Sequence, residues 1–171
     1  MQILFVCTGN ICRSPTAERL AVAQSAVLEV PNFNASSAGT HAVTGHPIHR
    51  DAARVLKQLG ADASDFAARQ LKPKIVNEAD LVITMTREHR DLVLEMAPRK
   101  LLRTFTLIEA ARIASELGAQ SIPDLAALRP QLAPNRRSDV PDPIGQSQEI
   151  FEMVGSQIAR LLPPLLDLCR N

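Results

Sequence analysis

A cysteine and an arginine near the start of the chain have the types and spacing needed to bind and attack an oxyanion. Residues 7–14 read Cys-Thr-Gly-Asn-Ile-Cys-Arg-Ser and follow a short apolar run, Gln2–Cys7. Ser14-Pro15 then predicts the start of a helix, with Ser14 as its cap. The N-terminus of a helix carries unpaired N–H groups and partial positive charge, so it binds phosphate well. The sequence therefore predicts a phosphate-binding loop at this junction.

The residue types within this loop suit phosphoryl transfer. Gly9 permits a sharp turn that directs backbone amides inward, and Arg13 adds a planar fork that can hold two phosphate oxygens. Cys7 lies in the same positive field, which favours its thiolate form, and Ser14 can donate a hydrogen bond to that thiolate. A nucleophile beneath an oxyanion cradle is the arrangement that phosphoryl transfer requires. We expect Cys7 to be the nucleophile and phosphate to be bound by Thr8, Gly9, Asn10, Ile11, Cys12 and Arg13.

Cleavage of a phosphate ester also needs a proton for the leaving oxygen, which a carboxylic acid can supply. The best candidate is Asp142 in Val140-Pro141-Asp142-Pro143, because the flanking prolines restrict its motion. Asp139 is the alternative, but the neighbouring Arg136-Arg137 would favour its ionised form and make it a poorer acid. The sequence therefore favours Asp142 as the general acid.

Other kinds of site lack the residues they need. Gly-x-Gly-x-x-Gly and Gly-Lys-Ser/Thr are absent, which leaves dinucleotide and nucleoside triphosphate loops unsupported. Cys7 and Cys12 could begin a zinc site, but no second Cys/His pair with ligand spacing follows them. No metal pattern links the four histidines, which are His41, His46, His49 and His89. We expect neither a metal nor a cofactor, and we interpret His89, on an apolar helix face, as a structural residue.

The elements that must position the loop alternate between strands and helices. Short apolar runs predict buried strands at Gln2–Cys7, Ser36–Gly39, Asp80–Met85 and Leu101–Leu107. Apolar residues at helical spacing predict helices after residue 14, over 52–59, 89–96 and 108–117, and from about Gln146 to a kink or end at Pro163-Pro164. This alternation predicts an α/β fold with a parallel sheet and helices on both faces. In such sheets ligands bind at the carboxyl ends of the strands, where Cys7 lies.

Composition indicates one ordinary domain. The chain has 171 residues, of which 46% are hydrophobic and 22% charged. Its 19 Lys+Arg residues nearly balance its 18 Asp+Glu residues, so no overall charge would attract nucleic acid or an anionic membrane. We therefore interpret residues 1–171 as a single domain, in which 119–141, rich in Pro, Ala and Arg without a clear period, form a long surface excursion. No apolar run is long enough to cross a bilayer, and no signal peptide is evident. The odd, small number of cysteines, three, suggests reduced thiols and not a disulfide scaffold. We expect a cytoplasmic monomer with no nucleic-acid or membrane partner.

These motifs together resemble the low-molecular-weight protein tyrosine phosphatases. Cys-Thr-Gly-Asn-Ile-Cys-Arg-Ser-Pro is similar to the signature loop of that family, and Val-Pro-Asp-Pro is similar to its acid loop. Three further motifs match in order: Ser37-Ala38-Gly39-Thr40, Ala68-Arg69-Gln70-Leu71 and Ala79-Asp80-Leu81-Val82. The resemblance covers most of residues 1–160. It implies a single-domain three-layer sandwich with a four-stranded parallel sheet, a cysteinyl-phosphate intermediate and no cofactor.

The resemblance also implies roles for individual residues and a class of partner. The substrate would be a phosphorylated protein or peptide, with inorganic phosphate or a similar oxyanion in the site. Cys12 matches the second loop cysteine of the family, which can protect the nucleophile reversibly under oxidation. By the same match the nucleophile is Cys7, the phosphate clamp is Arg13, the residues bracing the loop are Asn10 and Ser14, and the acid and later base is Asp142.

The substrate groove departs from the pattern of the family. Relatives often carry aromatic residues after the Asp-Pro of the acid and near the second strand, where this chain has Ile144, His41 and Val43. The chain contains no Trp or Tyr, so a phosphotyrosine ring would lose stacking partners worth about 0.5–1.5 kcal/mol per aromatic pair.

Three alternatives to a tyrosine phosphatase follow from the same residues. A phosphoarginine phosphatase of the family tends to carry Thr where Ile11 stands, and the apolar Ile11 favours an aryl ester. An arsenate reductase usually needs further cysteines, but none lies between Cys12 and Cys169. A non-catalytic phosphate-binding module would need no thiol. We therefore expect a phosphomonoester hydrolase of the protein-tyrosine-phosphatase type.

Overall fold

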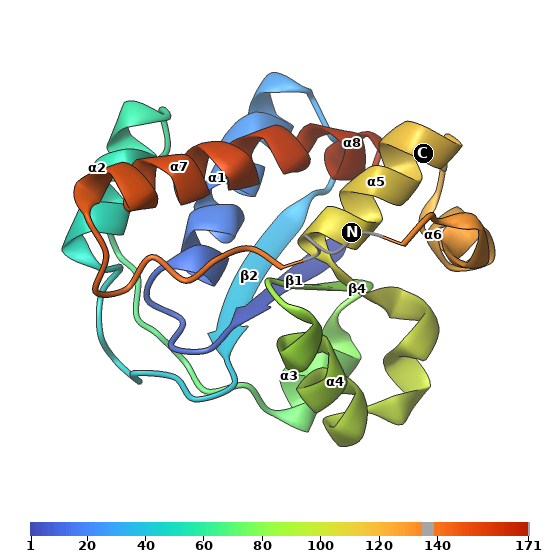
Figure 1. Ribbon diagram of the computed structural model, residues 1–171, viewed down its shortest axis with the longest axis horizontal. Helices are drawn as coiled ribbons and strands as arrows, with labels where there is room; N and C mark the ends of the chain where they lie inside the picture. Colours follow the sequence, from blue (N-terminus) through green and yellow to red (C-terminus); the bar gives the residue numbers. More distant parts are fainter. Residues whose placement is uncertain (135–138, 171) are drawn as a thin grey trace.

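Four parallel strands form one sheet at the centre of the molecule (Figure 1). The protein is described by a computed structural model that covers residues 1–134 and 139–170. The strands are β1 (Gln2–Cys7), β2 (Asn34–Gly39), β3 (Leu81–Thr84) and β4 (Thr104–Thr106), and their order is β2-β1-β3-β4. The chain passes from β1 to β2 on one side and then crosses to β3 on the other. The order therefore reverses at β1, and the crevice where ligands bind lies at its carboxyl end, beside Cys7.

Helices cover both faces of this sheet, which confirms the predicted three-layer α/β sandwich (Figure 1). Because side chains alternate along a strand, β1 directs Ile3 and Phe5 to the larger core and Leu4 and Val6 to the smaller one. The larger core is covered by α1 (Arg13–Val27), α2 (Arg50–Gln58), α5 (Leu107–Leu117), α7 (Gln148–Leu161) and α8 (Pro163–Asp167), and the smaller by α3 (Pro73–Glu78) and α4 (Arg87–Met96).

Most predicted elements are present, with changes at their ends. β1 has the predicted bounds, β2 begins two residues earlier than expected, and a new helix starts at Pro163 where the last helix was expected to kink or end. β4 is shorter than predicted because Pro98–Arg103 form a 3-10 helix, η1. The short helix α3 was not predicted. None of the helices in the described part of the chain is long and apolar enough to cross a membrane.

The expectation of a long surface excursion over residues 119–141 is wrong for its first half. Helix α6 (Ile122–Leu128) and a short 3-10 helix, η2 (Arg129–Gln131), occupy it. Ile122 and Leu125 of α6 are buried in the larger core. Residues 135–138 of the expected excursion lie outside the described residues. A helix of seven residues makes only about two turns, which is too short for a hydrophobic period to stand out in the sequence.

Leu125 tests whether α6 is part of the core. Its side chain is fully buried, so Leu125→Ala should lower the free energy of unfolding by about 2–5 kcal/mol through lost contacts and a cavity. Leu102→Ala is the matched control, because Leu102 is 62% exposed. That control should change stability by no more than about 0.5 kcal/mol. Urea unfolding followed by circular dichroism measures both, and equal losses would contradict the burial of α6.

Candidate active site

The loop between β1 and α1 turns its carbonyl groups outward, toward residues 40–49. Four carbonyl oxygens accept backbone hydrogen bonds of 2.7–2.9 Å: Cys7 from Thr40, Thr8 from His41, Gly9 from Val43 and Ile11 from His49. In a trans peptide the next N–H points opposite to the carbonyl. The following N–H groups, those of Thr8, Gly9, Asn10 and Cys12, therefore point to the inside of the loop. They form the kind of nest that holds an anion.

Asn10 holds the loop in this shape. Its backbone has φ of 54°, in the left-handed region, so the tight turn expected at Gly9 lies at Asn10 instead. Its buried side-chain oxygen accepts the Arg69 backbone N–H at 2.8 Å. This contact defines which end of the amide is oxygen, because a backbone N–H can only donate. The amide nitrogen then donates to Ser14 Oγ at 3.0 Å and to Ser37 Oγ at 2.8 Å.

Ser14 lies directly against the Cys7 sulfur, with 2.9 Å between Oγ and Sγ. Since Ser14 Oγ already accepts a hydrogen bond from Asn10, its own proton is available to the sulfur. A hydrogen bond donated to the thiolate stabilises that form of Cys7. The expectation that Ser14 caps the helix is wrong. Helix α1 begins at Arg13 after Cys12, whose side chain makes no capping bond, and Ser14 instead serves the loop.

Arg13 joins the loop to the segment that carries the candidate acid. Its Nη1 donates to the Val140 carbonyl at 3.1 Å, and its Nη2 donates to Asp142 Oδ2 at 2.9 Å. The Arg13 side chain is only 5% exposed, whereas that of Asp142 is 48% exposed. The structure thus places Cys7, Arg13 and Asp142 around one pocket of about 250 Å³. The side walls of this pocket are formed by Ile11, His41, Val43 and Ile144.

Cys12 lines the same pocket, but its environment favours the neutral thiol. Burial is the main cause that raises the pKa of Cys12 to about 12; the charges of Cys7 and Asp142 also raise it, and Arg13 lowers it. Cys12 is therefore protonated at neutral pH. All three cysteines, Cys7, Cys12 and Cys169, are free thiols.

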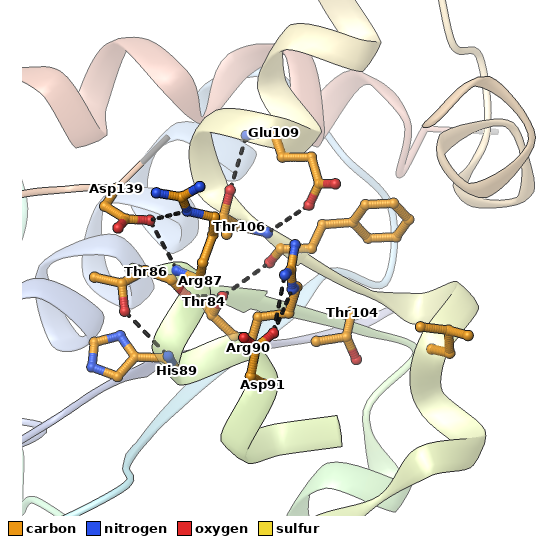
Figure 2. Close-up of polar contacts among 12 residues, drawn as sticks. Thr84, Thr86, Arg87, His89, Arg90, Asp91, Thr104, Thr106, Glu109 and Asp139 are labelled. Carbon is orange, nitrogen blue, oxygen red and sulfur yellow. Dashed lines mark hydrogen bonds and ion pairs between the residues drawn. The ribbon is translucent and has the colours of Figure 1, made fainter. Parts of the chain in front are cut away.

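Asp139, the alternative acid, is bound to the start of α4. Its Oδ1 accepts the Arg87 backbone N–H at 2.9 Å and lies 3.7 Å from Arg87 Nε (Figure 2). It does not line the pocket that contains Cys7. Arg136 and Arg137, expected to neighbour it, lie outside the described residues. Of the two aspartates, the structure brings Asp142 to the loop.

His89 contacts the loop between β1 and α1, a contact that the sequence did not predict. Its side chain is buried in α4, and its Nε2 lies 2.8 Å from Thr8 Oγ1. Its own backbone N–H donates to Thr86 Oγ1, which caps α4 (Figure 2). Within the described residues His89 Nδ1 has no hydrogen-bond partner. Because a buried N–H is rarely left without an acceptor, we infer that the ring proton is on Nε2 and is donated to Thr8.

The donors around the pocket suit an anion. Within residues 1–134 and 139–170, no group of three or more His, Cys, Asp or Glu side chains is placed to hold a metal ion. The groups directed at the pocket are instead backbone N–H groups and the Arg13 guanidinium, which bind negatively charged oxygens.

The relatives found by comparison with known proteins are named as phosphatases. A family model described as "Low molecular weight phosphotyrosine protein phosphatase" matches residues 2–125. The low molecular weight protein-tyrosine-phosphatase Etp of Escherichia coli (strain K12) is 30% identical over 158 residues, which are 92% of this chain and 87% of Etp. The protein-arginine-phosphatase of Geobacillus stearothermophilus is also 30% identical, over 166 residues, which are 97% of this chain and 94% of that protein.

One similar solved structure carries a phosphoryl group in its active site. The YwlE arginine phosphatase, as a cysteine-to-serine mutant with a phosphorylated active-site serine, is similar with a TM-score of 0.78 and 26% sequence identity. The match covers 97% of this chain and 93% of that one. Relatives of comparable similarity are thus named for two different phosphorylated residues, tyrosine and arginine.

The titration of His89 gives a prediction for stability. Burial, and then the charge of Arg13, lower its pKa from 6.5 to about 4, although Asp142 and Asp139 act in the other direction. The unfolded chain, with the ordinary pKa, binds more protons than the folded chain between these two values. Stability should therefore fall as the pH drops from about 6.5 to about 4 and show no further loss from this group below that, a total of roughly 2–3 kcal/mol.

Urea unfolding at pH 7 and pH 4.5 measures this loss. His89→Gln should lose less stability than the wild type over that interval, because glutamine does not titrate. His46→Gln is the control, since it makes the same substitution at an exposed position. An equal pH dependence in all three proteins would contradict the role assigned to His89.

Proposed function

The chain belongs to the low molecular weight phosphotyrosine protein phosphatase family, and on this basis we propose that it hydrolyses aryl phosphate monoesters, of the phosphotyrosine type, in proteins or peptides. The observation that carries the proposal is the Cys7 sulfur, which lies 2.9 Å from the Ser14 hydroxyl in the pocket that Arg13 and Asp142 also line. A thiol placed beside a hydroxyl donor and beneath inward N–H groups suits attack on phosphorus.

In the first step the Cys7 thiolate attacks phosphorus. The S–P bond forms while the bond from phosphorus to the leaving oxygen breaks, and Asp142, as a carboxylic acid, gives its proton to that oxygen. Arg13 and the inward N–H groups hold the other phosphate oxygens through the transition state. Because Arg13 Nη2 donates to Asp142 Oδ2, bound phosphate would compete with this carboxylate for the guanidinium.

In the second step water attacks the cysteinyl phosphate. Asp142, now a carboxylate, takes a proton from the water as the P–O bond forms and the S–P bond breaks. Inorganic phosphate leaves, and Cys7 returns as a thiolate. Cys12, in the same pocket, would protect Cys7 after oxidation: its thiol condenses with a Cys7 sulfenic acid to give a disulfide and water.

The walls of the pocket favour an aryl ester over phosphoarginine. Ile11, Val43 and Ile144 present apolar surface on which an aromatic ring can pack. The guanidinium of phosphoarginine would lose water against these walls, and Asp142 is the one carboxylate that lines the pocket in the described structure. Phosphoarginine is nevertheless the second candidate substrate, because the chain is as similar to a protein-arginine-phosphatase as to Etp.

Cys7 and Arg13 can be tested with a synthetic aryl phosphate and no added metal. Cys7→Ser should abolish turnover while keeping the affinity for phosphate. Arg13→Lys should slow turnover by a factor of about a hundred or more, because a point charge cannot replace the planar fork. Turnover and phosphate inhibition are measured for both. Substantial activity in Cys7→Ser would refute the nucleophile, and near-native rates in Arg13→Lys would show that the backbone N–H groups suffice.

The two aspartates differ in how their effects depend on the leaving group. Asp142→Asn should slow hydrolysis of phenyl phosphate by roughly two to four decades, because the phenolate needs a proton. It should slow nitrophenyl phosphate much less, since that leaving group is acidic. Asp139→Asn is the matched control and should leave both rates near those of the wild type. Were Asp139→Asn to show the leaving-group dependence instead, the acid would lie three residues earlier than proposed.

Residue 11 tests the choice of substrate. Ile11→Thr should lower kcat/KM for a phosphotyrosine peptide by about tenfold relative to a phosphoarginine peptide, because it replaces an apolar wall with a hydroxyl. Val27→Thr, at a position 84% exposed, is the control for the same kind of change away from the pocket. An unchanged ratio in Ile11→Thr would show that residue 11 does not select the substrate. A wild type that prefers phosphoarginine would overturn the proposed aryl specificity.

A further inference from the structure

A second hollow, of about 280 Å³, shares no lining residue with the Cys7 pocket. Four arginines line it: Arg87 and Arg90 from α4, Arg112 from α5 and Arg129 from η2. Helices α4 and α5 follow β3 and β4, so both begin at the edge of the sheet where Cys7 ends β1. Figure 2 shows the side of the hollow formed by Arg87, Arg90, Thr106 and Glu109.

The charges that face the hollow are predominantly positive. Glu109 is the one carboxylate among its lining residues in the described structure; its oxygens lie 3.0 Å from Arg129 Nε and 3.1 Å from the Thr106 backbone N–H. Arg129 and Glu109 thus form a neutral pair. The other three guanidinium groups have no carboxylate partner within the hollow.

The remaining acidic neighbours of these arginines lie outside the hollow and are exposed. Arg90 pairs with Asp91 at 3.0 Å and Arg112 with Glu116 at 2.7 Å, and these two acids are 61% and 50% exposed. Arg87 Nε lies 3.7 Å from Asp139, which is 41% exposed. Exposed ion pairs contribute little and are screened by salt. Arg90 donates both Nε and Nη2 to Asp91, and Arg112 binds both oxygens of Glu116. An anion in the hollow would therefore have to compete with these two exposed carboxylates for the guanidinium groups.

Packing and hydrogen bonds hold Arg129 in place at the side of the hollow. The Arg129 guanidinium lies 3.8 Å from the centre of the buried Phe105 ring and donates to the Leu101 carbonyl at 3.2 Å. Burial lowers the pKa of Arg129, while the charge of Glu109 raises it and that of Arg90 lowers it. The N-terminal ends of α4 and α5 add partial positive charge.

We propose that this hollow is a second oxyanion-binding site, for a phosphate-class dianion, separate from the catalytic loop. Arginine forks bind tetrahedral oxyanions through paired N–H groups. Three of the lining arginines could turn theirs to a dianion that displaces their exposed carboxylate partners. The dianion is either free inorganic phosphate or the phosphate group of a further phosphorylated residue in a peptide. The site requires neither Cys7 nor turnover.

Titration with sodium phosphate at constant ionic strength, followed by amide NMR, tests the site. The amides of Ile108 and Arg112 report on the hollow and that of Gly9 on the catalytic loop, so the two are read separately. We expect saturable shifts at both. Arg90→Gln should weaken binding at the hollow about tenfold and leave the Gly9 titration unchanged. Arg50→Gln, at a position 85% exposed on α2, is the matched control and should change neither.

Shifts at Ile108 and Arg112 that do not saturate, or that persist unchanged in both Arg90→Gln and Arg112→Gln, would overturn the proposal. The second variant keeps the test valid if the first fails to fold. Loss of the Gly9 titration alone would count against the proposed function and not against this site.

The source of the dianion can be distinguished with the Cys7→Ser protein, which should bind phosphate without hydrolysing it. Tighter binding of a doubly than of a singly phosphorylated peptide, abolished by Arg90→Gln, would assign the hollow to a peptide phosphate. Equal binding of the two peptides, with phosphate still saturating the hollow, would assign it to the free anion.

Discussion

The candidate site depends on the peptide groups of residues 7–12 being held with their carbonyl oxygens outward. The N–H groups that hold them belong to residues 40–49, which follow β2 directly. The pairing of β1 with β2 sets Cys7 opposite Gly39 and so brings this segment against the loop. Gly39 must lack a side chain, because a Cβ there would collide with the Thr8 carbonyl oxygen. The register of two strands therefore creates the anion nest that the chemistry requires.

The acid segment is anchored to the same framework from the other side of β1. The Val140 N–H donates to the Met85 carbonyl, just beyond β3, at 2.8 Å, and the Val140 carbonyl accepts from Arg13. Val140 is fully buried, so Asp142 extends from a fixed point toward the loop. Arg13 is thus both a candidate phosphate ligand and the link that keeps Asp142 in the same pocket as Cys7. Loss of the Arg13 side chain would be expected to weaken phosphate binding and to release Asp142 from its position near Cys7.

Several positively charged groups lie at the carboxyl edge of the sheet. Helices α1, α4 and α5 all begin there, and their N-terminal ends add to the charges of Arg13, Arg87 and Arg90. Burial and then the charge of Arg13 account for the lowered pKa of His89, which lies beside Thr8. The Cys7 pocket and the proposed second site both lie near these positive groups. A single topological feature, parallel strands followed by helices, therefore underlies the loop chemistry and the arginine-lined hollow.

The α/β class, the bounds of β1 and the candidates Cys7, Arg13 and Asp142 could be predicted from the sequence, because they depend on local patterns and short motifs. Three features required the folded chain: the contact of the Ser14 hydroxyl with the Cys7 sulfur, the left-handed turn at Asn10, and the contact of Arg13 with Asp142 and not Asp139. The same holds for His89, which lies 81 residues from its partner Thr8, and for α6, whose helix depends on core contacts. Such contacts join residues that are distant along the chain, so they exist only once the strand order has brought the segments together.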